Sequence, residues 1–364
     1  MKCAIVPALC AAMVLGVPAQ AAEAVAPATN STGTWAEITV GWGHRGAFAL
    51  DRLTGNIFGT SWHERGTLMS TNFGATFTRV DSNCASGDSF SPYAIFAAAD
   101  GSKLAVFSSQ DNSRSGHSLD GGKTWTSWTK AGAHGLEYGV VDWASGAIFL
   151  MPHEEYRAYF SPDMGKSWTN LPSVNYPGGT NKSHPIGKRN YYQSGIGIFS
   201  ATELVLSHDS ASGIQRSEDC GRTWTRVADH FCQGPVQIFQ GTGYWLAKKE
   251  DAGKWSGILL ATKDRGKTWQ PVGKPIENGD SPYMTVPRFG KDEKQILVAA
   301  AAGILESIDG GNTWNLAVKY PEAVAGKLNV STVDTWDCFE YDPLHDVFYL
   351  YFFLEGPRTW VYRR

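Results

Sequence analysis

An eight-residue pattern, S-x-D-x-G-x-T-W, recurs along this 364-residue chain and constrains its fold more than any other feature. The first residues of successive copies lie 48, 43, 56, 45 and 45 positions apart. The copies span residues 70–77, 118–125, 161–168, 217–224, 262–269 and 307–314. The first copy is degenerate, with Asn72 in place of Asp and Phe77 in place of Trp. A nearly constant spacing of this length predicts a repeat protein whose units pack side by side.

The residues of this pattern suit a tight turn that leads into a strand. Asp can accept hydrogen bonds from its own backbone, and Gly adopts positive φ without a steric penalty. The Trp then begins a strand and can bury a large ring between neighbouring units. The pattern resembles the Asp-box of sialidase-type β-propellers. That resemblance implies an all-β propeller in which the box belongs to the scaffold and not to the active site.

Each repeat reads as four strands, A to D, with the Asp-box turn between C and D. The expected blades 1 to 6 span residues 44–81, 92–129, 134–172, 191–228, 234–273 and 282–318. A seventh unit near residues 337–363 has strands A to C only, and residues 33–40 read as a strand D without a blade. Pairing the two closes the ring and removes open sheet edges. We therefore predict one domain, a seven-bladed β-propeller over residues 33–364, with blade 7 closed by the N-terminal strand.

The first 32 residues read as segments that precede this domain. Lys2 is followed by an apolar run over residues 4–17 and by an A-x-A-like cleavage site at residues 19–21. The run is too short to span a membrane, and the pattern is typical of a secretory signal peptide. We expect a signal peptide at residues 1–21, a flexible leader at 22–32 and a secreted protein. The sequons at Asn30, Asn181 and Asn329 would carry glycans in a eukaryotic host.

Four cysteines remain after the signal peptide, namely Cys84, Cys220, Cys232 and Cys338. An even number of cysteines in an oxidising compartment favours disulfides. Cys220 and Cys232 are close in sequence and would close a short loop, which leaves Cys84 to pair with Cys338. The alternative is four buried thiols. The C-x-x-C spacing typical of metal sites does not occur.

The propeller topology predicts where functional residues gather. The A–B turns and Asp boxes lie at one rim, and the start of strand A meets the end of strand B at the other, where loops vary and the central funnel opens. In blade 3, His134 begins strand A and His153 ends strand B; in blade 4, Tyr192 and His208 take these places. Histidine suits proton transfer near neutral pH.

This arrangement resembles the ulvan lyases and rhamnose–glucuronate lyases, which are seven-bladed propellers. The resemblance implies a secreted polysaccharide lyase that cleaves a uronic-acid-containing glycan by β-elimination, with His134, His153 and Tyr192 as catalytic residues. In those families a basic group neutralises the uronate carboxylate. A Tyr or His removes the C5 proton, and an acid protonates the leaving oxygen.

Several further residues are candidates for substrate binding. Where the resembled families have an arginine at the end of strand B of blade 4, this chain has His208. We therefore expect Arg216, Arg189 or His208 to bind the carboxylate, since guanidinium groups match carboxylates in shape and charge. In blade 1, His44 and His63 repeat the spacing of the blade 3 pair, so they either line the same funnel or are only a feature of the repeat. Weaker candidates at this rim are Lys248, Lys249, Glu250, Tyr283, Arg288, Trp336 and Asp337.

The overall charge is only mildly negative and does not argue against an anionic sugar as a partner. The formal net charge is −3, so neither nucleic acid nor an anionic membrane is expected. We expect a monomer whose partner is an acidic polysaccharide or oligosaccharide held at a local basic site. No cluster of metal ligands is evident and no cofactor is expected, although some of the resembled lyases hold a structural metal, which leaves a divalent cation open.

Two other functions remain open on this scaffold, because propellers host unrelated activities. A glycoside hydrolase would use a pair of carboxylates, for which Glu64, Glu137, Glu154 and Glu155 are the candidates. A non-catalytic propeller would bind glycan or protein without turnover. A true sialidase is disfavoured, because the F/Y-R-I-P element of that family does not precede the first box.

Overall fold

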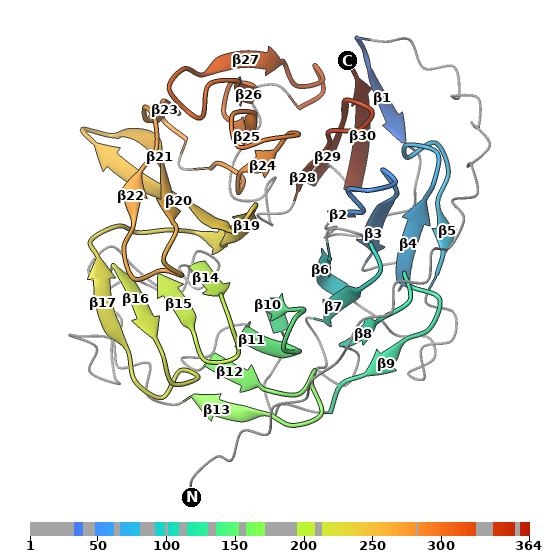
Figure 1. Cartoon of the computed structure of the whole chain (residues 1–364). Coiled ribbons are helices and arrows are strands. Elements are labelled where there is room, and N and C mark those ends of the chain that lie inside the picture. Colours follow the sequence, from blue (N-terminus) through green and yellow to red (C-terminus); the bar gives the residue numbers. More distant parts are fainter. Residues whose placement is uncertain are drawn as a thin grey trace, which may run out of the picture.

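The computed structural model of this chain is a ring of seven small β-sheets around a central axis (Figure 1). It describes residues 33–38, 48–61, 66–80, 92–98, 101–108, 115–129, 136–152, 158–171, 195–207, 213–281, 283–324, 338–353 and 357–364. Every named element in these segments is a strand, and the sheets succeed one another around the ring in chain order. The predicted all-β, seven-bladed propeller is confirmed.

Blades 1 to 3 are four-stranded antiparallel sheets whose first strand lies nearest the axis. Their strands are β2 (Phe48–Leu50), β3 (Ile57–Ser61), β4 (Gly66–Ser70) and β5 (Thr78–Arg79) in blade 1; β6 (Pro92–Ala97), β7 (Leu104–Ser108), β8 (Gly116–Ser118) and β9 (Thr126–Ser127) in blade 2; and β10 (Leu136–Asp142), β11 (Ala147–Pro152), β12 (Ala158–Ser161) and β13 (Thr169–Leu171) in blade 3.

Blades 4 to 6 follow the same plan with additions, and blade 7 combines both ends of the chain. Their strands are β14 (Gly195–Ile198), β15 (Leu204–Ser207), β16 (Ile214–Ser217) and β17 (Thr225–Ala228) in blade 4, with β18 (Gly234–Pro235) beside it; β19 (Gln237–Phe239), β20 (Thr242–Asp251), β21 (Lys254–Thr262), β22 (Gln270–Pro271) and β23 (Ile276–Glu277) in blade 5; β24 (Arg288–Phe289), β25 (Ile296–Ala300), β26 (Gly303–Ser307) and β27 (Asn315–Val318) in blade 6; and β28 (Phe339–Asp342), β29 (Val347–Phe353), β30 (Pro357–Arg363) and β1 (Trp35–Ile38) in blade 7.

The N-terminal strand closes the ring as predicted. β1 pairs antiparallel with β30, from Trp35 opposite Tyr362 to Ile38 opposite Thr359. The indole Nε1 of Trp35 also donates a hydrogen bond to the Lys319 carbonyl in the next blade, at 2.7 Å. The outermost strand of blade 7 is therefore supplied by the other end of the chain, and the edge of β30 is covered.

The Asp-box turns share one hydrogen-bond pattern. In the last box, Ser307 Oγ donates to Asp309 Oδ1 at 2.8 Å and accepts from the Gly311 amide at 2.7 Å, while the Thr313 amide donates to Asp309 Oδ1 at 2.8 Å. In the degenerate first box, Asn72 takes the place of the Asp and accepts the same backbone bond at 2.9 Å. The box is a local turn that joins strands C and D, as its residues predicted.

A short strand that leads into blade 5 pairs with the inner strand of blade 4. β18 pairs parallel with the inner strand β14, with Gly195 opposite Gly234. A Cβ at Gly195 would lie 2.4 Å from the Trp245 ring, and a Cβ at Gly197 would lie 2.5 Å from Val236. Glycine at both positions of β14 is therefore what allows the chain of blade 5 to approach.

Blade 5 carries a long hairpin. β20 continues to Asp251, and nine residue pairs join it to β21. The two turn residues, Ala252 and Gly253, have φ values of 50° and 79°. Two residues with positive φ form the turn that matches the twist of paired strands, so β20 and β21 stay paired up to the turn.

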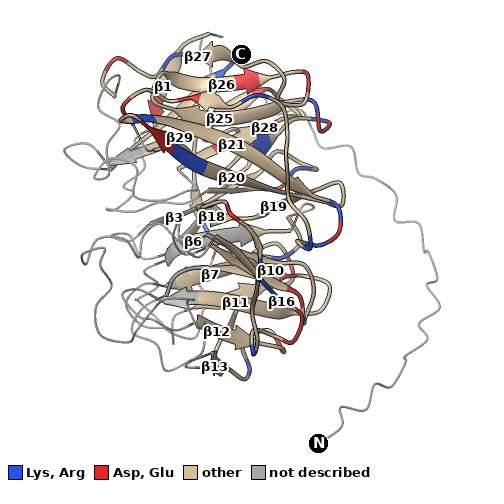
Figure 2. Ribbon diagram, turned by 90° about the vertical axis from the view of Figure 1, so that its left-hand side faces the viewer, with Lys and Arg blue, Asp and Glu red and all other residues tan. Residues whose placement is uncertain are grey.

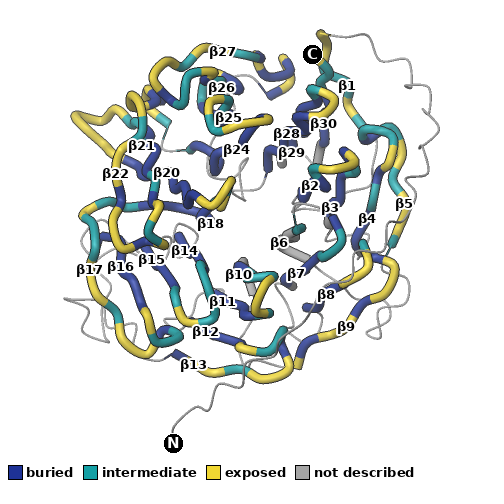
Figure 3. The backbone as a smooth tube through the Cα atoms, in the orientation of Figure 1, coloured by how far each residue is buried: buried dark blue, intermediate teal, exposed yellow. Residues whose placement is uncertain are grey.

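The core lies between blades, and the charge lies at the strand ends. Apolar side chains from neighbouring sheets pack in clusters such as Phe107, Trp128, Phe149 and Leu206 across blades 2 to 4. Figure 3 shows the buried residues along the strands and the exposed residues at the turns. In the side view of Figure 2, most Lys, Arg, Asp and Glu residues gather at turns and strand ends.

The predicted disulfide between Cys220 and Cys232 is wrong, because no disulfide joins the two sulfurs. Cys220 lies in the Asp-box turn of blade 4 with a φ of 62°. Cys232 lies beyond β17 and pairs with Ala247 at the other end of the blade. Cysteines in a disulfide have Cα atoms less than about 7 Å apart, and here a whole strand separates them. Cys84 lies outside the described residues, so its pairing with Cys338 stays a prediction, as do the signal peptide and leader.

Candidate functional site

The two rims of the propeller can be assigned from the register of strands A and B. Leu136 pairs with Pro152 at the start of β10 and the end of β11, and Gly195 pairs with Ser207 at the start of β14 and the end of β15. We call this end the open rim, and the end with the A–B turns and Asp boxes the Asp-box rim. The segments that precede strand A and follow strand B therefore leave each blade together at the open rim.

Most predicted site residues belong to those flanking segments. His153 directly follows Pro152, His208 directly follows Ser207, and Tyr192 precedes Gly195 by three positions. Their own side chains are outside the described part of the chain, so their roles stay predictions. The candidates that lie outside it are His44, His63, Glu64, His134, His153, Glu154, Glu155, Arg189, Tyr192, His208, Trp336 and Asp337.

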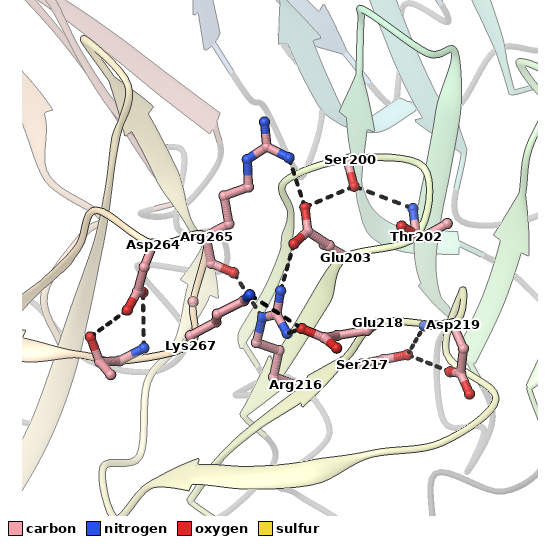
Figure 4. A network of polar contacts seen from close by, with 12 residues as sticks. Ser200, Thr202, Glu203, Arg216, Ser217, Glu218, Asp219, Asp264, Arg265 and Lys267 are labelled. Atoms are coloured by element: carbon pink, nitrogen blue, oxygen red, sulfur yellow. Dashed lines mark hydrogen bonds and ion pairs between the residues drawn. The ribbon is translucent and has the colours of Figure 1, made fainter.

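Arg216 is described, and its predicted role as carboxylate clamp at the open rim is wrong. It lies on β16 next to the Asp-box, at the opposite rim, and is only 6% exposed. Its Nη2 donates to Glu203 Oε1 at 2.6 Å, and its Nη1 donates to Glu218 (Figure 4). Its Nε donates to the Arg265 carbonyl at 2.9 Å. The guanidinium is thus engaged on all three nitrogens by protein groups.

These contacts make Arg216 the centre of a network that joins blades 4 and 5 (Figure 4). Glu203 Oε2 also accepts a hydrogen bond from Arg265 Nη1 of blade 5 at 2.9 Å. The hydrogen bond from Arg216 and the charge of Arg216 hold the pKa of Glu218 below its usual value. The sequence signal missed here was Glu218, two residues after Arg216, because residues two apart on a strand share a face and can form an ion pair.

Lys248 has the same count along strand B of blade 5 as His153 has along strand B of blade 3. In blade 3, Ile148 pairs with the first Asp-box residue, Ser161, and His153 comes five positions later. In blade 5, Gly243 pairs with the first box residue, Thr262, and Lys248 also comes five positions later. Lys248 is therefore the register equivalent of His153.

The Lys248 side chain turns toward blade 6. Leu246, two residues earlier on β20, packs with Met284 and Val298 of blade 6, and residues two apart on a strand share a face. The Lys248 Nζ lies 5.7 Å from the centre of the Tyr283 ring. The residue is 9% exposed, and burial lowers the pKa of its amine to about 7. An amine in this range can exchange a proton at neutral pH.

Asn278 fixes the segment that carries Tyr283. Its Nδ2 donates to the carbonyl of Tyr283 at 2.9 Å, and its Oδ1 accepts from the Ala301 amide at 2.8 Å. The Asn278 amide donates to the Trp255 carbonyl on the blade 5 hairpin at 2.9 Å. The side chain and the backbone N–H of one buried residue therefore tie the segment to both blades. Burial raises the pKa of the Tyr283 phenol.

Tyr283 is in turn the register equivalent of Tyr192. In blade 6, Phe289 pairs with Ile296, which pairs with the first box residue, and Tyr283 lies six positions before Phe289. In blade 4, Ile198 pairs with Leu204, which pairs with the first box residue, and Tyr192 lies six positions before Ile198. The contact between Lys248 and Tyr283 shows that these two register positions meet across the boundary of blades 5 and 6.

Arg288, another candidate from the sequence, joins the inner strands of three blades. Its Nε donates to the Phe339 carbonyl at 3.0 Å and lies 3.1 Å from Glu340 Oε2. Its Nη1 donates to Gln237 Oε1 at 3.1 Å. Arg52 reaches the same region and donates to the carbonyls of Phe289 and Gly290. These charges are used to hold inner strands together near the Asp-box rim.

The described segments contain no group of three or more His, Cys, Asp or Glu side chains that could hold a metal ion. No helix in the same segments has the length and hydropathy needed to cross a membrane.

Comparison with known proteins gives the fold. No protein-family model and no curated protein matches the chain. A structure titled "YCF48 bound to D1 peptide" matches with a TM-score of 0.53 and 12% identity, over 93% of this chain and 97% of that one. A GH74 enzyme of Niastella koreensis matches with a TM-score of 0.55 and 15% identity over 87% of this chain, and the GH74 xyloglucanase of Xanthomonas campestris with 0.56 and 16% over 88%.

These similarities show the fold of the chain and do not show its activity. The chain spans about half the length of the two GH74 structures, 52% of each. At such low identity a structural match shows the propeller alone. The known propellers that resemble this one include glycoside hydrolases and a peptide-bound protein.

Proposed function

We propose that this protein is a secreted carbohydrate-active propeller that cleaves a uronic-acid-containing glycan by β-elimination at the open rim. The observation that carries the proposal is the Lys248–Tyr283 contact. By register, we expect His153 and Tyr192 to hold the same two positions at the boundary of blades 3 and 4. A base and a phenol supplied by consecutive blades are the groups that this reaction needs.

The chemistry assigns a role to each group. Tyr192 takes the proton from C5 of the uronate, the electron pair forms a double bond between C4 and C5, and the C4–O bond breaks. His134 and His153 supply the proton to the leaving oxygen or neutralise the uronate carboxylate. His208 and Arg189 remain the further candidates for carboxylate binding, because Arg216 is engaged at the other rim.

Each of the two alternative functions is supported by one observation. The fold match to two GH74 enzymes supports a glycoside hydrolase on the same scaffold. The fold match to a propeller with bound peptide supports a non-catalytic binder. The three readings differ in their products, so a single assay separates them.

The test is a screen of uronate-containing polysaccharides, read in parallel by near-ultraviolet absorbance and by reducing ends. A lyase raises both signals, because elimination leaves an unsaturated uronate. A hydrolase raises reducing ends alone. A binder raises neither signal but shifts the glycan in an affinity gel. Reducing ends without absorbance on every substrate would overturn the lyase proposal.

Variants then test the site. His153→Ala and Tyr192→Phe should each lower the elimination rate by about 10²–10⁴-fold, the usual contribution of general acid–base catalysis. His345→Ala is the matched control, because His345 lies in the A–B turn of blade 7 beside Asp342, at the Asp-box rim. Wild-type rates in the first two variants would remove the site assignment.

A further inference from the structure

The hairpin of β20 and β21 (Figure 1) carries a tryptophan near its tip, at the open rim. Trp255 is the second residue of β21 and pairs with Glu250 of β20. The residue is half-buried, and within the described part of the chain its indole makes no ring contact and no hydrogen bond. Tryptophan combines a large apolar face with one polar N–H, so both remain available here to a ligand.

Tyr283 lies on the same side of this hairpin as Trp255. Gly257 follows Trp255 by two residues on β21, so the two positions share a face. A Cβ at Gly257 would lie 2.8 Å from Met284 Sδ, so this face is turned toward the segment before β24. Tyr283 precedes Met284 in that segment and is half-buried. Lys248, which pairs with Gly257, contacts the Tyr283 ring from this face. Both aromatic residues are therefore brought to one side of the hairpin.

One buried residue, Asn278, holds the two aromatic residues in a fixed arrangement. Its backbone N–H donates to the Trp255 carbonyl at 2.9 Å, and its Nδ2 donates to the Tyr283 carbonyl at 2.9 Å. The Trp255 amide donates in turn to the Gly279 carbonyl at 2.7 Å. A binding site whose parts are fixed before the ligand arrives loses less conformational entropy when the ligand binds.

The charge beside the two rings favours a neutral ligand. Glu250 lies directly opposite Trp255, so the two side chains share a face. Glu250 is exposed and forms no ion pair in the described segments. The other charged residue of β20 on this face, Lys248, is only 9% exposed. A free carboxylate accepts hydrogen bonds from hydroxyl groups and repels an anionic group, so a neutral sugar fits this position better than a uronate.

The apolar residues of this region favour a sugar over a protein partner. None of the large apolar side chains that are exposed in the described segments belongs to the hairpin or to the segment with Tyr283. The centre of a protein interface is built from apolar contacts. A pyranose ring instead presents C–H groups on its faces and hydroxyl groups at its edge. Two aromatic rings with a carboxylate beside them match that pattern.

We propose that Trp255, Tyr283 and Glu250 form a subsite for a neutral sugar residue of the glycan bound at the open rim. The proposal rests on the proposed function for the class of polymer, and it adds a contact point outside the proposed reacting residues. The two rings stack on the face of the sugar. The indole N–H and the Glu250 carboxylate bond to its hydroxyl groups.

The first test measures affinity by calorimetry, with a short and a long oligosaccharide of alternating rhamnose and glucuronate, and with a neutral xyloglucan oligosaccharide. Trp255→Ala should lower the affinity for the long oligosaccharide by about 10- to 30-fold, as expected for an aromatic residue at the centre of an interface. The loss should be equal at low and high ionic strength, because stacking on a neutral sugar involves no charge pair. Lys249→Ala, on the other face of the hairpin, is the control and should match the wild type.

A second test uses the wild-type protein alone, so it holds even where a variant does not fold. The long oligosaccharide should slow the oxidation of Trp255 by N-bromosuccinimide, read by mass spectrometry of peptides. Trp314 is the internal control, because it is also half-buried but belongs to an Asp-box at the other rim. Its oxidation should not change. In cleavage assays, Trp255→Ala should raise KM for long chains and leave kcat unchanged.

Several outcomes would overturn the subsite. They are equal affinities of Trp255→Ala and the wild type for the long oligosaccharide, a loss that disappears at high ionic strength, or oxidation of Trp255 at an unchanged rate in the complex. Cleavage of long chains by Trp255→Ala with wild-type kinetics would reject the subsite and leave the proposed function intact. Binding of either oligosaccharide that depends on Trp255, without any cleavage, would reject the lyase and keep the subsite. Binding of neither glycan by the wild type would reject both.

Discussion

Arg216 Nη2 and Glu203 Oε1 lie 2.6 Å apart in a pair that is nearly excluded from solvent and that faces the neighbouring blade. The same guanidinium donates to the Arg265 carbonyl of blade 5. A residue whose chemistry suggests a ligand clamp is therefore a tie between two blades.

Replacing Arg216 should affect stability and not catalysis. Arg216→Met leaves Glu203 without one buried partner, and breaking such a pair costs about 3 kcal/mol. Urea unfolding measures this loss. The matched control is Arg222→Met, because Arg222 is exposed in the same Asp-box. Equal midpoints for the two variants would contradict the structural role, and a lower rate per folded molecule would restore Arg216 to the site.

The N-terminal strand should be required for the closed ring. Removal of residues 1–39 deletes β1 and uncovers the edge of β30. We expect Tm to fall by about 5 °C or more and the protein to associate, since open edges pair with other chains. Removal of residues 1–32 leaves the strand in place and is the control. Calorimetry and light scattering measure the two effects, and identical behaviour of both truncations would argue against closure by this strand.

Ser307 of the last Asp-box should contribute more to the free energy of unfolding than its exposed neighbour Ile308. Ser307 is fully buried, and its Oγ accepts a hydrogen bond from the Gly311 amide. Ser307→Ala leaves that amide without a partner, which costs about 1–3 kcal/mol. Ile308, in the same turn, is 68% exposed, so Ile308→Ala should change the free energy of unfolding very little. Denaturant titration of the two variants is the measurement, and a larger loss for Ile308→Ala would refute the assignment.

Acid should weaken the Asp-box turns. Burial raises the pKa of Asp264, but hydrogen bonds from Thr268, Thr262 and the Lys267 amide outweigh it and lower the pKa to about 2. The unfolded pKa is about 3.9, so this stabilisation is complete above pH 4 and is lost as pH falls toward 2. Asp264→Asn should flatten that part of the stability curve. Asp229→Asn, an exposed residue outside the boxes, is the control, and parallel curves for all three proteins would contradict the prediction.

The sequence predicted the scaffold because the interactions that form each Asp-box turn are local. Each Asp-box contains its own donors and acceptors, so Ser307, Asp309 and Gly311 form the turn without help from distant residues. The spacing of the boxes gave the number of blades, and the unmatched strand near Trp35 indicated how the ring closes.

The same reasoning failed for contacts that depend on packing between blades. Cys220 and Cys232 are close in sequence, but a strand places them at opposite ends of blade 4. The side chain of Arg216 has the right chemistry for a carboxylate ligand, but Glu203 and Glu218 of its own blade already bind it, and its Nε donates to the Arg265 carbonyl of blade 5. Neither outcome follows from spacing along the chain, because both depend on how the strands are arranged in space.

Sequence alone determined the repeat, the turn and the closure, since each arises from residues within one unit or from the need to cover an edge. Only the tertiary structure decided that Lys248 turns from its own blade toward Tyr283 of the next. The physical reason is that a side chain at a blade boundary is placed by the face of its strand and by the neighbour packed against that face. Thirty-five residues separate the two in sequence, and the ring brings them together.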